Sequence, residues 1–153
     1  LMIKVNVEID NKSWHNKIKK PKKYFSKKLK YISKVVKFFK SRNITFTILL
    51  TNSSTMKKLN KKFRKKNKAT DVLSFPSFVA NELKKLKEKK IYIGDIAISY
   101  EIINSRAKKE NFYQEFDKVW VHGILHLVGY DHKKNIDYLK MARTERKILD
   151  LIN

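Results

Sequence analysis

Hydrophobic and polar residues alternate in two segments of the chain, residues 3–9 and 44–50. A period of two is the pattern of a half-buried β-strand, so each segment is predicted to form one. Two further strands are predicted at Val72–Phe75, which Pro76 closes, and at Ile91–Ser99. These four segments are the candidates for one sheet.

Helical spacing, with apolar residues three and four positions apart, accounts for most of the remaining chain. An amphipathic helix with a lysine-rich outer face is predicted from about Tyr24 to Arg42, and Ser53 or Ser54 can cap a short helix after the second strand. Lys61–Lys68 is predicted to be a solvated loop, and Ser77–Lys90 a surface excursion with a helical turn. Later helices are expected at about Tyr100–Lys109, Tyr113–Val128 and Asn135–Ile152.

No repeat or Gly/Ser-rich linker interrupts this order, and 153 residues is an ordinary size for one domain. Because strands precede most of the helices, we expect a single α+β domain over residues 1–153, with a small mixed four-stranded sheet covered by helices. No apolar run approaches the ~18 residues that cross a bilayer, and the amino terminus lacks the apolar core of a signal peptide. The expectation is a soluble cytoplasmic protein without a membrane span.

Charge is extreme and unevenly placed. The chain has 37 Lys and Arg against 14 Asp and Glu, a formal net charge of +23. Between Asp10 and Asp71 there is no acidic residue, while 21 of the basic ones lie there. Such an excess favours a polyanionic partner, without separating RNA from DNA or from an acidic surface. The abundance of Lys, Asn and Ile leaves open that part of the excess is a bias of overall composition.

Three of the four histidines lie in residues 122–132, which read H-G-I-L-H-L-V-G-Y-D-H. His122 and His126 are one helical turn apart and project from the same face, at a separation that suits a chelated metal. Gly129 is placed to end the helix in a left-handed conformation, which turns His132 back toward the pair. Cysteine is absent, so any metal must be held by histidine and carboxylate. We therefore predict one divalent metal, zinc, on a helix and its following turn.

A lone histidine in a core is more often bonded to a backbone carbonyl, and His15 is expected to be an ordinary surface residue. The helix around His122 and His126 is apolar nearly all round, so two unpaired imidazoles there would carry a desolvation cost that a metal removes. Three histidines also leave one coordination position for water, which favours a catalytic over a structural site.

The H-x3-H-x5-H spacing resembles that of metzincin proteases, in which a glutamate follows the first histidine as general base. Gly123 occupies that position here, so proteolysis becomes the second choice. A metal that lowers the pKa of water to ~7 can instead support attack on a phosphodiester. Arg64 is the candidate for phosphate binding, although it can equally be one more charge in a basic loop. Glycine inside a helix also indicates close approach of a strand or a substrate.

These residues resemble the YbeY family of metal-dependent endoribonucleases. The signature H-G-x-L-H-L-x-G-Y-D-H stands at residues 122–132, T-D-V-L-S-F-P at Thr70–Pro76, and G-D-I-A-I-S at Gly94–Ser99. Further residues stand where the family places such types: Leu59, Asn60, Arg64, Glu115, Met141 and Glu145. The resemblance covers about residues 44–150.

The resemblance implies cleavage of single-stranded RNA, zinc on His122, His126 and His132, and an Arg64 that binds or activates the phosphate. It also implies work in 16S ribosomal RNA maturation and ribosome quality control, with the small ribosomal subunit as partner. Asp71 and Asp95 could fix Arg64 or a water, or could cap turns.

Asp131 could orient a ligand imidazole or could be a turn residue. Two alternatives remain. One is a non-enzymatic RNA-binding or ribosome factor in which the metal only holds the fold. The other is a metallopeptidase that takes its base from elsewhere, for example Glu115 or Asp131.

Overall fold

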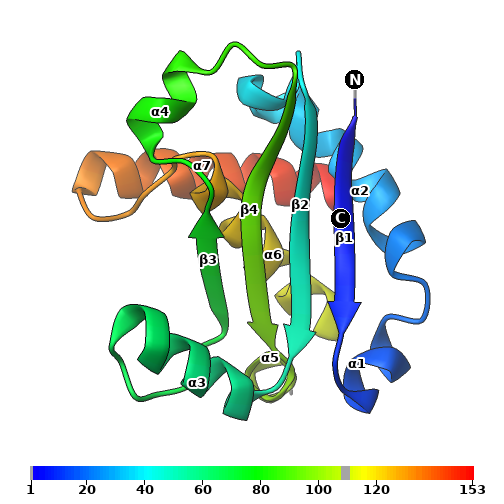
Figure 1. The fold of residues 1–153 in the computed structure, drawn as a ribbon. Helices are drawn as coiled ribbons and strands as arrows, with labels where there is room; N and C mark the ends of the chain where they lie inside the picture. Colours follow the sequence, from blue (N-terminus) through cyan, green and yellow to red (C-terminus); the bar gives the residue numbers. More distant parts are fainter. Residues whose placement is uncertain (1, 108–110) are drawn as a thin grey trace.

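A computed structural model describes residues 2–107 and 111–153, and its centre is one four-stranded sheet in the order β1-β2-β4-β3 (Figure 1). β1 (Ile3–Ile9), β2 (Asn43–Thr51) and β4 (Lys90–Ser99) are parallel to one another. β3 (Val72–Pro76) is antiparallel to β4 and forms one edge of the sheet. The predicted α+β class and mixed four-stranded sheet are therefore confirmed.

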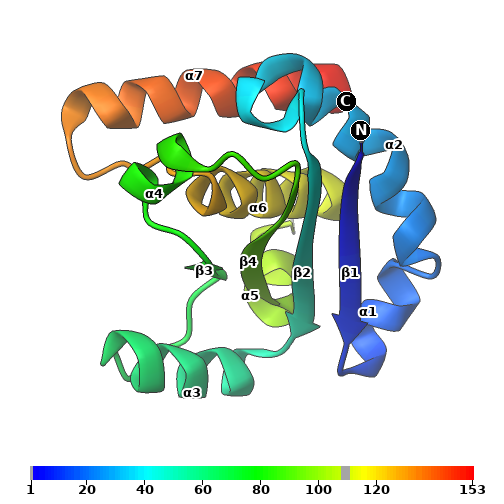
Figure 2. The same ribbon diagram turned by 45° about the horizontal axis from the view of Figure 1, so that its top comes forward.

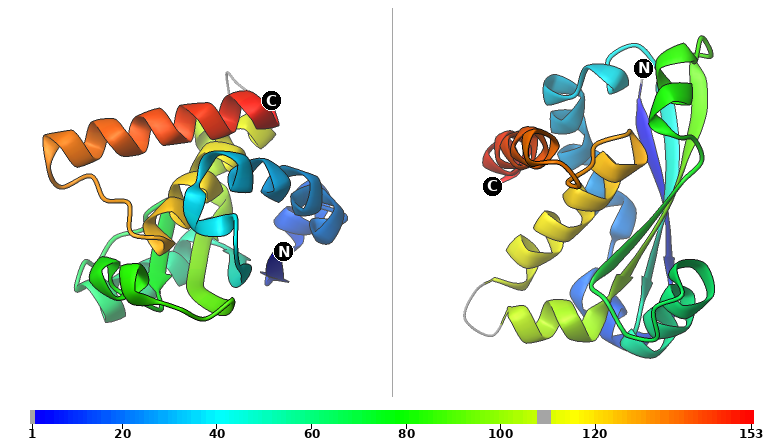
Figure 3. Two further views of the ribbon diagram at one scale, coloured as in Figure 1. Left: turned by 90° about the horizontal axis from the view of Figure 1, so that it is seen from above. Right: turned by 90° about the vertical axis from the view of Figure 1, so that its left-hand side faces the viewer.

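The long helices cover one face of this sheet (Figure 3). They are α2 (Pro21–Val35), α6 (Phe112–Leu127) and α7 (Asn135–Ile152). α6 packs on β3 and β4 on one side and on α7 on the other. Its nearly all-round apolar sequence follows from that central position, because both faces of the helix meet apolar neighbours. The main core lies between these helices and the inward side chains of the strands, such as Phe46, Ile48 and Ile96.

α3 (Ser53–Arg64) lies on the other face of the sheet at one end of β3 (Figure 2). α4 (Ala80–Lys85) follows the other end of β3, and its Ala80 and Leu83 lie beside Gly129 in the turn after α6. Met56 of α3 packs with Leu73 and Ala97 in a second, small core. α4 confirms the helical turn predicted in the polar segment 77–90.

The predicted helix from Tyr24 to Arg42 is wrong in its extent. α2 starts earlier, at Pro21, and ends at Val35, after which Lys37–Phe39 forms a 3₁₀ turn. Val36 is extended, with φ −102° and ψ 112°, and is buried like Phe39. Adjacent β-branched residues are weak helix formers, and the break lets both side chains enter the core.

One helix was not predicted from the sequence. α1 (Lys12–Lys17) begins where the side chain of Asn11 accepts a hydrogen bond from the backbone of Trp14. The buried indole of Trp14 donates to the carbonyl of Thr51 at 2.7 Å, which anchors this helix beneath the end of β2. In the sequence, the available signal for this helix was Asn11, a residue type that often caps the start of a helix, before a polar segment.

Further element boundaries differ in smaller ways. α3 continues to Arg64, so the first half of the predicted loop Lys61–Lys68 is helical, with its lysines on the exposed side. α5 (Tyr100–Arg106) stops short of Lys109, and residues 108–110 lie outside the described ones. α6 and α7 match the expected helices to within one residue. Among the described residues, no helix combines the length and apolar character that a membrane crossing requires.

Candidate metal centre

α6 carries His122 and His126 on its last turns, close against β4. The side chain of Asn111 caps the helix by accepting from the backbone N–H of Tyr113 at 2.8 Å. A Cβ placed on Gly123 would lie 3.0 Å from Cγ2 of Ile96, which is tighter than ordinary contact. The close approach expected at Gly123 is therefore that of a strand, and it fixes the height of the helix over the sheet.

The end of α6 turns the chain back as predicted. Gly129 has a positive φ of 95°, its N–H bonds to the carbonyl of His126 at 3.2 Å, and the N–H of Tyr130 bonds to the carbonyl of Leu125 at 3.0 Å. This pair of hydrogen bonds is a Schellman motif, which needs a residue that tolerates positive φ. The turn brings His132 beside the helix.

The three histidines converge. One ring nitrogen from each of His122, His126 and His132 lies within 4.8 Å of the others, and the Nε2 atoms of His122 and His126 are 3.0 Å apart. His122 and His126 are partly buried, whereas His132 is exposed. The convergence predicted from the spacing is thus confirmed, in a geometry that could hold a metal ion.

The other ring nitrogens are already engaged. Nδ1 of His122 lies 2.6 Å from a carboxylate oxygen of Glu145 in α7, and Nδ1 of His126 lies 2.9 Å from the carbonyl of Tyr130. Both partners are acceptors, so each Nδ1 carries the proton and each Nε2 presents a lone pair. Burial, and secondly the electrostatic interaction with neighbouring His122, lowers the pKa of His126 below its usual 6.5 and favours that neutral form.

Two lone pairs that face each other at 3.0 Å repel unless a cation lies near both. Zinc bound tetrahedrally at ~2.0–2.1 Å from nitrogen would set its ligands about 3.3 Å apart. The donor set therefore fits a zinc-sized ion with a small adjustment. Within the described residues, the cluster comprises the three histidines and no fourth ligand. A tetrahedral ion held by these three ligands would have one coordination position left for a reactant.

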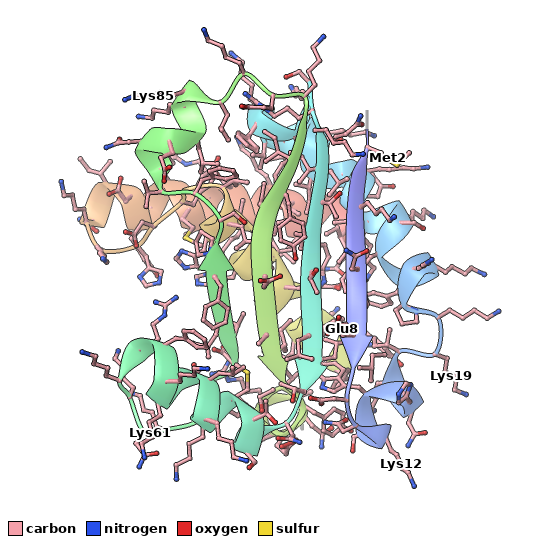
Figure 4. The ribbon with its side chains drawn as sticks, in the orientation of Figure 1. Met2, Glu8, Lys12, Lys19, Lys61 and Lys85 are labelled. Atoms are coloured by element: carbon pink, nitrogen blue, oxygen red, sulfur yellow. The ribbon has the colours of Figure 1, made fainter. Side chains whose placement is uncertain are left out.

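The histidines open into a groove of about 760 Å³ at the β3 edge of the sheet. Residues from the end of α3, from β3, from the segment leading into α4 and from the 129–133 turn line it. α3 and α4 stand at the two ends of β3, and Figure 4 shows Lys61 of α3 and Lys85 of α4 pointing outward. The groove is thus flanked by basic helices.

Arg64 lies on the wall of this groove with His122 and His126. Its guanidinium donates to the backbone carbonyl of Ser74 at 2.7 Å, and the buried hydroxyl of Ser74 donates to the carbonyl of Gly123 at 3.1 Å. One residue of the edge strand thus links the arginine to the histidine helix. Within the described residues, the other N–H groups of Arg64 meet no protein acceptor, so they stay available to a ligand in the groove.

Fixing Arg64 was one of the alternatives for Asp71 and Asp95, and in the described part of the chain neither of them contacts it. Asp71 accepts from Arg106 at 2.6 Å and from the backbone of Val72 at 2.7 Å, and Asp95 accepts from the hydroxyl of Tyr92 on the open face of the sheet. A backbone carbonyl holds the arginine in their place, because Arg64 ends its helix directly beside β3.

Asp131 does not orient a ligand imidazole. Its carboxylate accepts from the backbone N–H of His132 at 2.7 Å, which makes it a turn residue. The imidazole partners are Glu145 and the carbonyl of Tyr130, neither of which could be assigned from local spacing. Glu145 was singled out from the sequence only because it stands where the YbeY family places such a residue.

Two other sequence candidates lie away from the centre. Glu115, in the first turn of α6, pairs with Lys118 at 3.2 Å and stands about 10 Å along the helix axis from His122. His15 is exposed on α1, the surface position expected for it.

Comparison with known proteins gives consistent relatives. The family model for Endoribonuclease YbeY matches residues 8–153. A protein of Pelagibacter ubique with that name is 45% identical over 156 residues, covering 99% of this chain and 97% of its own. One from Ehrlichia canis is 34% identical over 97% of this chain and 92% of its own. The solution structure of a Thermotoga maritima protein covers 99% of the chain and 89% of its own with a TM-score of 0.62 and 23% identity, which speaks for the fold alone.

Proposed function

The chain belongs to the Endoribonuclease YbeY family, and we propose that it is a zinc-dependent endoribonuclease that cuts single-stranded ribosomal RNA at the three-histidine centre. The relatives' name supports RNA cleavage in general. The metal and the parts played by His122, His126 and His132 are argued from this chain's own residues, and the preference for single strands is what the resemblance to that family implies.

The observation that carries the proposal is the pair of Nε2 lone pairs held 3.0 Å apart at the mouth of the groove. Glu145 and the carbonyl of Tyr130 keep these nitrogens deprotonated and aimed at one point. All-nitrogen ligation with an open position favours zinc over magnesium or calcium, which prefer oxygen. A zinc ion bound there supplies Lewis acidity, which lowers the pKa of water and polarises a phosphoryl oxygen.

Arg64 binds the scissile phosphate in this proposal. Its hydrogen bond to the Ser74 carbonyl holds the guanidinium on the groove wall before substrate arrives. The planar fork can then donate two parallel N–H bonds to the phosphate oxygens, where charge develops in phosphoryl transfer. His122 and His126 act as ligands and set where that phosphate must lie.

Charge favours an RNA substrate over a peptide. The stretch from Asn11 to Thr70, which contains all of α3 and Arg64, has no acidic residue. A phosphate backbone gains affinity from every cation that it meets, whereas a peptide without acidic residues does not. We extend the proposal to precursor 16S ribosomal RNA in maturation and quality control, with the small ribosomal subunit as partner and the cytoplasm as the place of work.

The two alternatives fit the geometry less well. A peptidase needs a carboxylate base near the metal, but Gly123 takes the usual position, and Glu145 is bonded to the far side of His122. A purely structural metal would be closed by a fourth ligand, whereas His132 is exposed and the centre opens into the groove.

The test compares purified wild type with His126→Ala on single-stranded fragments of ribosomal RNA. Cleavage should disappear in His126→Ala and persist in His15→Ala, which removes an exposed histidine from α1. Casein should remain intact with all three proteins. Cleavage that survives His126→Ala would defeat the proposal.

A further inference from the structure

An aromatic pair lies next in the chain to residues that line the groove, Arg64 among them. Phe63 in the last turn of α3 is 55% exposed, and its ring meets that of Phe75 edge to face at 5.3 Å. Phe75 lies in β3 between Ser74 and Pro76, which both line the groove. Each ring is therefore next in the chain to residues that line the groove: Phe63 to Arg64, and Phe75 to Ser74 and Pro76.

The aromatic pair lies on one face of β3 and the histidines lie on the other, so this strand separates them. Ser74 points toward α6, where its hydroxyl meets the carbonyl of Gly123. Because side chains alternate along a strand, Phe75 points to the opposite face, toward α3 and Phe63. Arg64 spans the edge between them through its hydrogen bond to the Ser74 carbonyl. A phosphate bound by Arg64 would therefore lie at the strand edge, next to the residue that follows Phe63 in the chain.

The surroundings of Phe63 are cationic. The ammonium of Lys62 lies 5.2 Å from the centre of the Phe63 ring, and Lys61 precedes it on the outer side of α3 (Figure 4). A large apolar ring left half in water among lysines suits a ligand that has both a flat apolar face and negative charge. An unpaired nucleotide has both.

We propose that Phe63, supported from behind by Phe75, stacks on an unpaired RNA base next to the phosphate held by Arg64. The inference rests on the proposed function and names the residue that selects single strands. A base within a duplex is already stacked on both sides, so the ring can accept only a base that is free to swing out. Stacking of this kind tolerates any base, because each has a π face.

The test measures the affinity of short oligoribonucleotides in which one nucleotide at a time is replaced by an abasic one. Binding is measured on a His126→Ala background so that the RNA stays intact. One abasic position should weaken binding by roughly 5- to 150-fold. With Phe63→Leu added, that penalty should vanish at that position.

Tyr31→Leu is the matched control. Tyr31 is a partly exposed aromatic on α2 with the ammonium of Lys34 5.1 Å from its ring centre, and it lies outside the groove lining. It should leave the abasic penalty unchanged. A penalty that persists in Phe63→Leu, or that disappears equally in Tyr31→Leu, overturns the inference.

A second variant covers the case in which Phe63→Leu does not fold. Trp14 and Trp120 are both 0% exposed, so the tryptophan of Phe63→Trp reports on its own surroundings. Single-stranded RNA should quench its emission, and a duplex or an abasic strand should not. Equal quenching by all three contradicts the inference. If the wild type cuts RNA but the abasic penalty or the tryptophan quenching contradicts the prediction, only the role of Phe63 is wrong. If the wild type neither cuts nor binds RNA, the proposed function is wrong as well.

Discussion

His122 and His126 face each other through Nε2 because different partners hold their other ring nitrogens. Tyr130 offers a neutral carbonyl at 2.9 Å, whereas Glu145 offers a carboxylate at 2.6 Å. The carboxylate makes its imidazole the stronger donor to a metal. We therefore expect the zinc affinity of the site to depend more on the Glu145 carboxylate than on the Tyr130 carbonyl.

Glu145→Gln should lower zinc affinity about 10- to 100-fold, because the amide keeps the size of the side chain but removes its charge. A competition titration with a chromogenic chelator measures this. Glu115→Gln, on the same helix as the histidines but paired with Lys118, serves as control and should bind zinc normally. Equal affinity in both variants would show that Glu145 does not tune the site.

Arg64→Lys should reduce kcat for RNA cleavage by about 10²-fold or more, the usual loss when one donor to a developing oxyanion is removed. Lysine keeps the charge but cannot both hold the Ser74 carbonyl and present a planar fork. Single-turnover cleavage under saturating RNA measures the effect. Wild-type rates in Arg64→Lys would reduce Arg64 to one basic residue among many.

Local spacing was sufficient to predict the ligands but not what supports them. His122, His126 and the turn at Gly129 obey rules that span a few residues, so their convergence was visible in the sequence. Glu145 reaches His122 from α7, 23 residues along the chain, and only tertiary packing sets that approach. The carbonyl of Ser74, which holds Arg64, carries no side-chain signal at all.

At the scale of elements, the end of α6 carries most of the geometry. The Schellman turn at Gly129 places both the carbonyl that orients His126 and the chain that returns His132. The helix and the turn therefore act as one unit, so a substitution in the turn should also alter metal binding.

Gly129→Ala should destabilise the metal-free protein by about 1–2 kcal/mol, because a Cβ disfavours a φ of +95°. It should also weaken zinc binding by moving the Tyr130 carbonyl. Urea unfolding of the stripped protein gives the first value. Gly129→Asn, which tolerates a left-handed conformation better, should lose less. Equal stability of the alanine variant and wild type would contradict the assigned role of the turn.

Element types were predicted better than element ends. Strong periodicity placed the four strands and the helices α6 and α7, because both are amphipathic or buried over many residues. The break at Val36 was missed because its cause is burial of Val36 and Phe39 in the core, which periodicity alone does not reveal. α1 was missed because six residues are too few for a helical period to stand out.

For the molecule as a whole, the position of the positive charge matters more than its total. Lys61 and Lys85 stand on the two helices that flank the groove, whereas Lys12 and Lys19 lie on the other side, near α1 (Figure 4). If part of the lysine excess reflects composition alone, the second pair should contribute little to RNA binding.

Lys61→Gln combined with Lys85→Gln should reduce the salt dependence of RNA binding by about 1.4 in the slope of log affinity against log salt, or ~0.7 for each phosphate contact. Lys12→Gln combined with Lys19→Gln should leave that slope unchanged. Fluorescence anisotropy across a series of salt concentrations measures both. Equal changes in the two double variants would mean that RNA binds over the whole basic surface and not along the groove.

Metal titration of cleavage tests most directly whether the three histidines hold the ion on which the reaction depends. Protein purified without a chelating tag is stripped, checked by elemental analysis and far-UV circular dichroism, and then given zinc in steps while cleavage of a single-stranded ribosomal RNA fragment is followed. We predict a folded but inactive stripped protein, because the apolar core of the sheet does not involve the centre. Activity should then rise and level off at one zinc ion per chain. Full cleavage by protein shown to be free of metal would contradict the assignment.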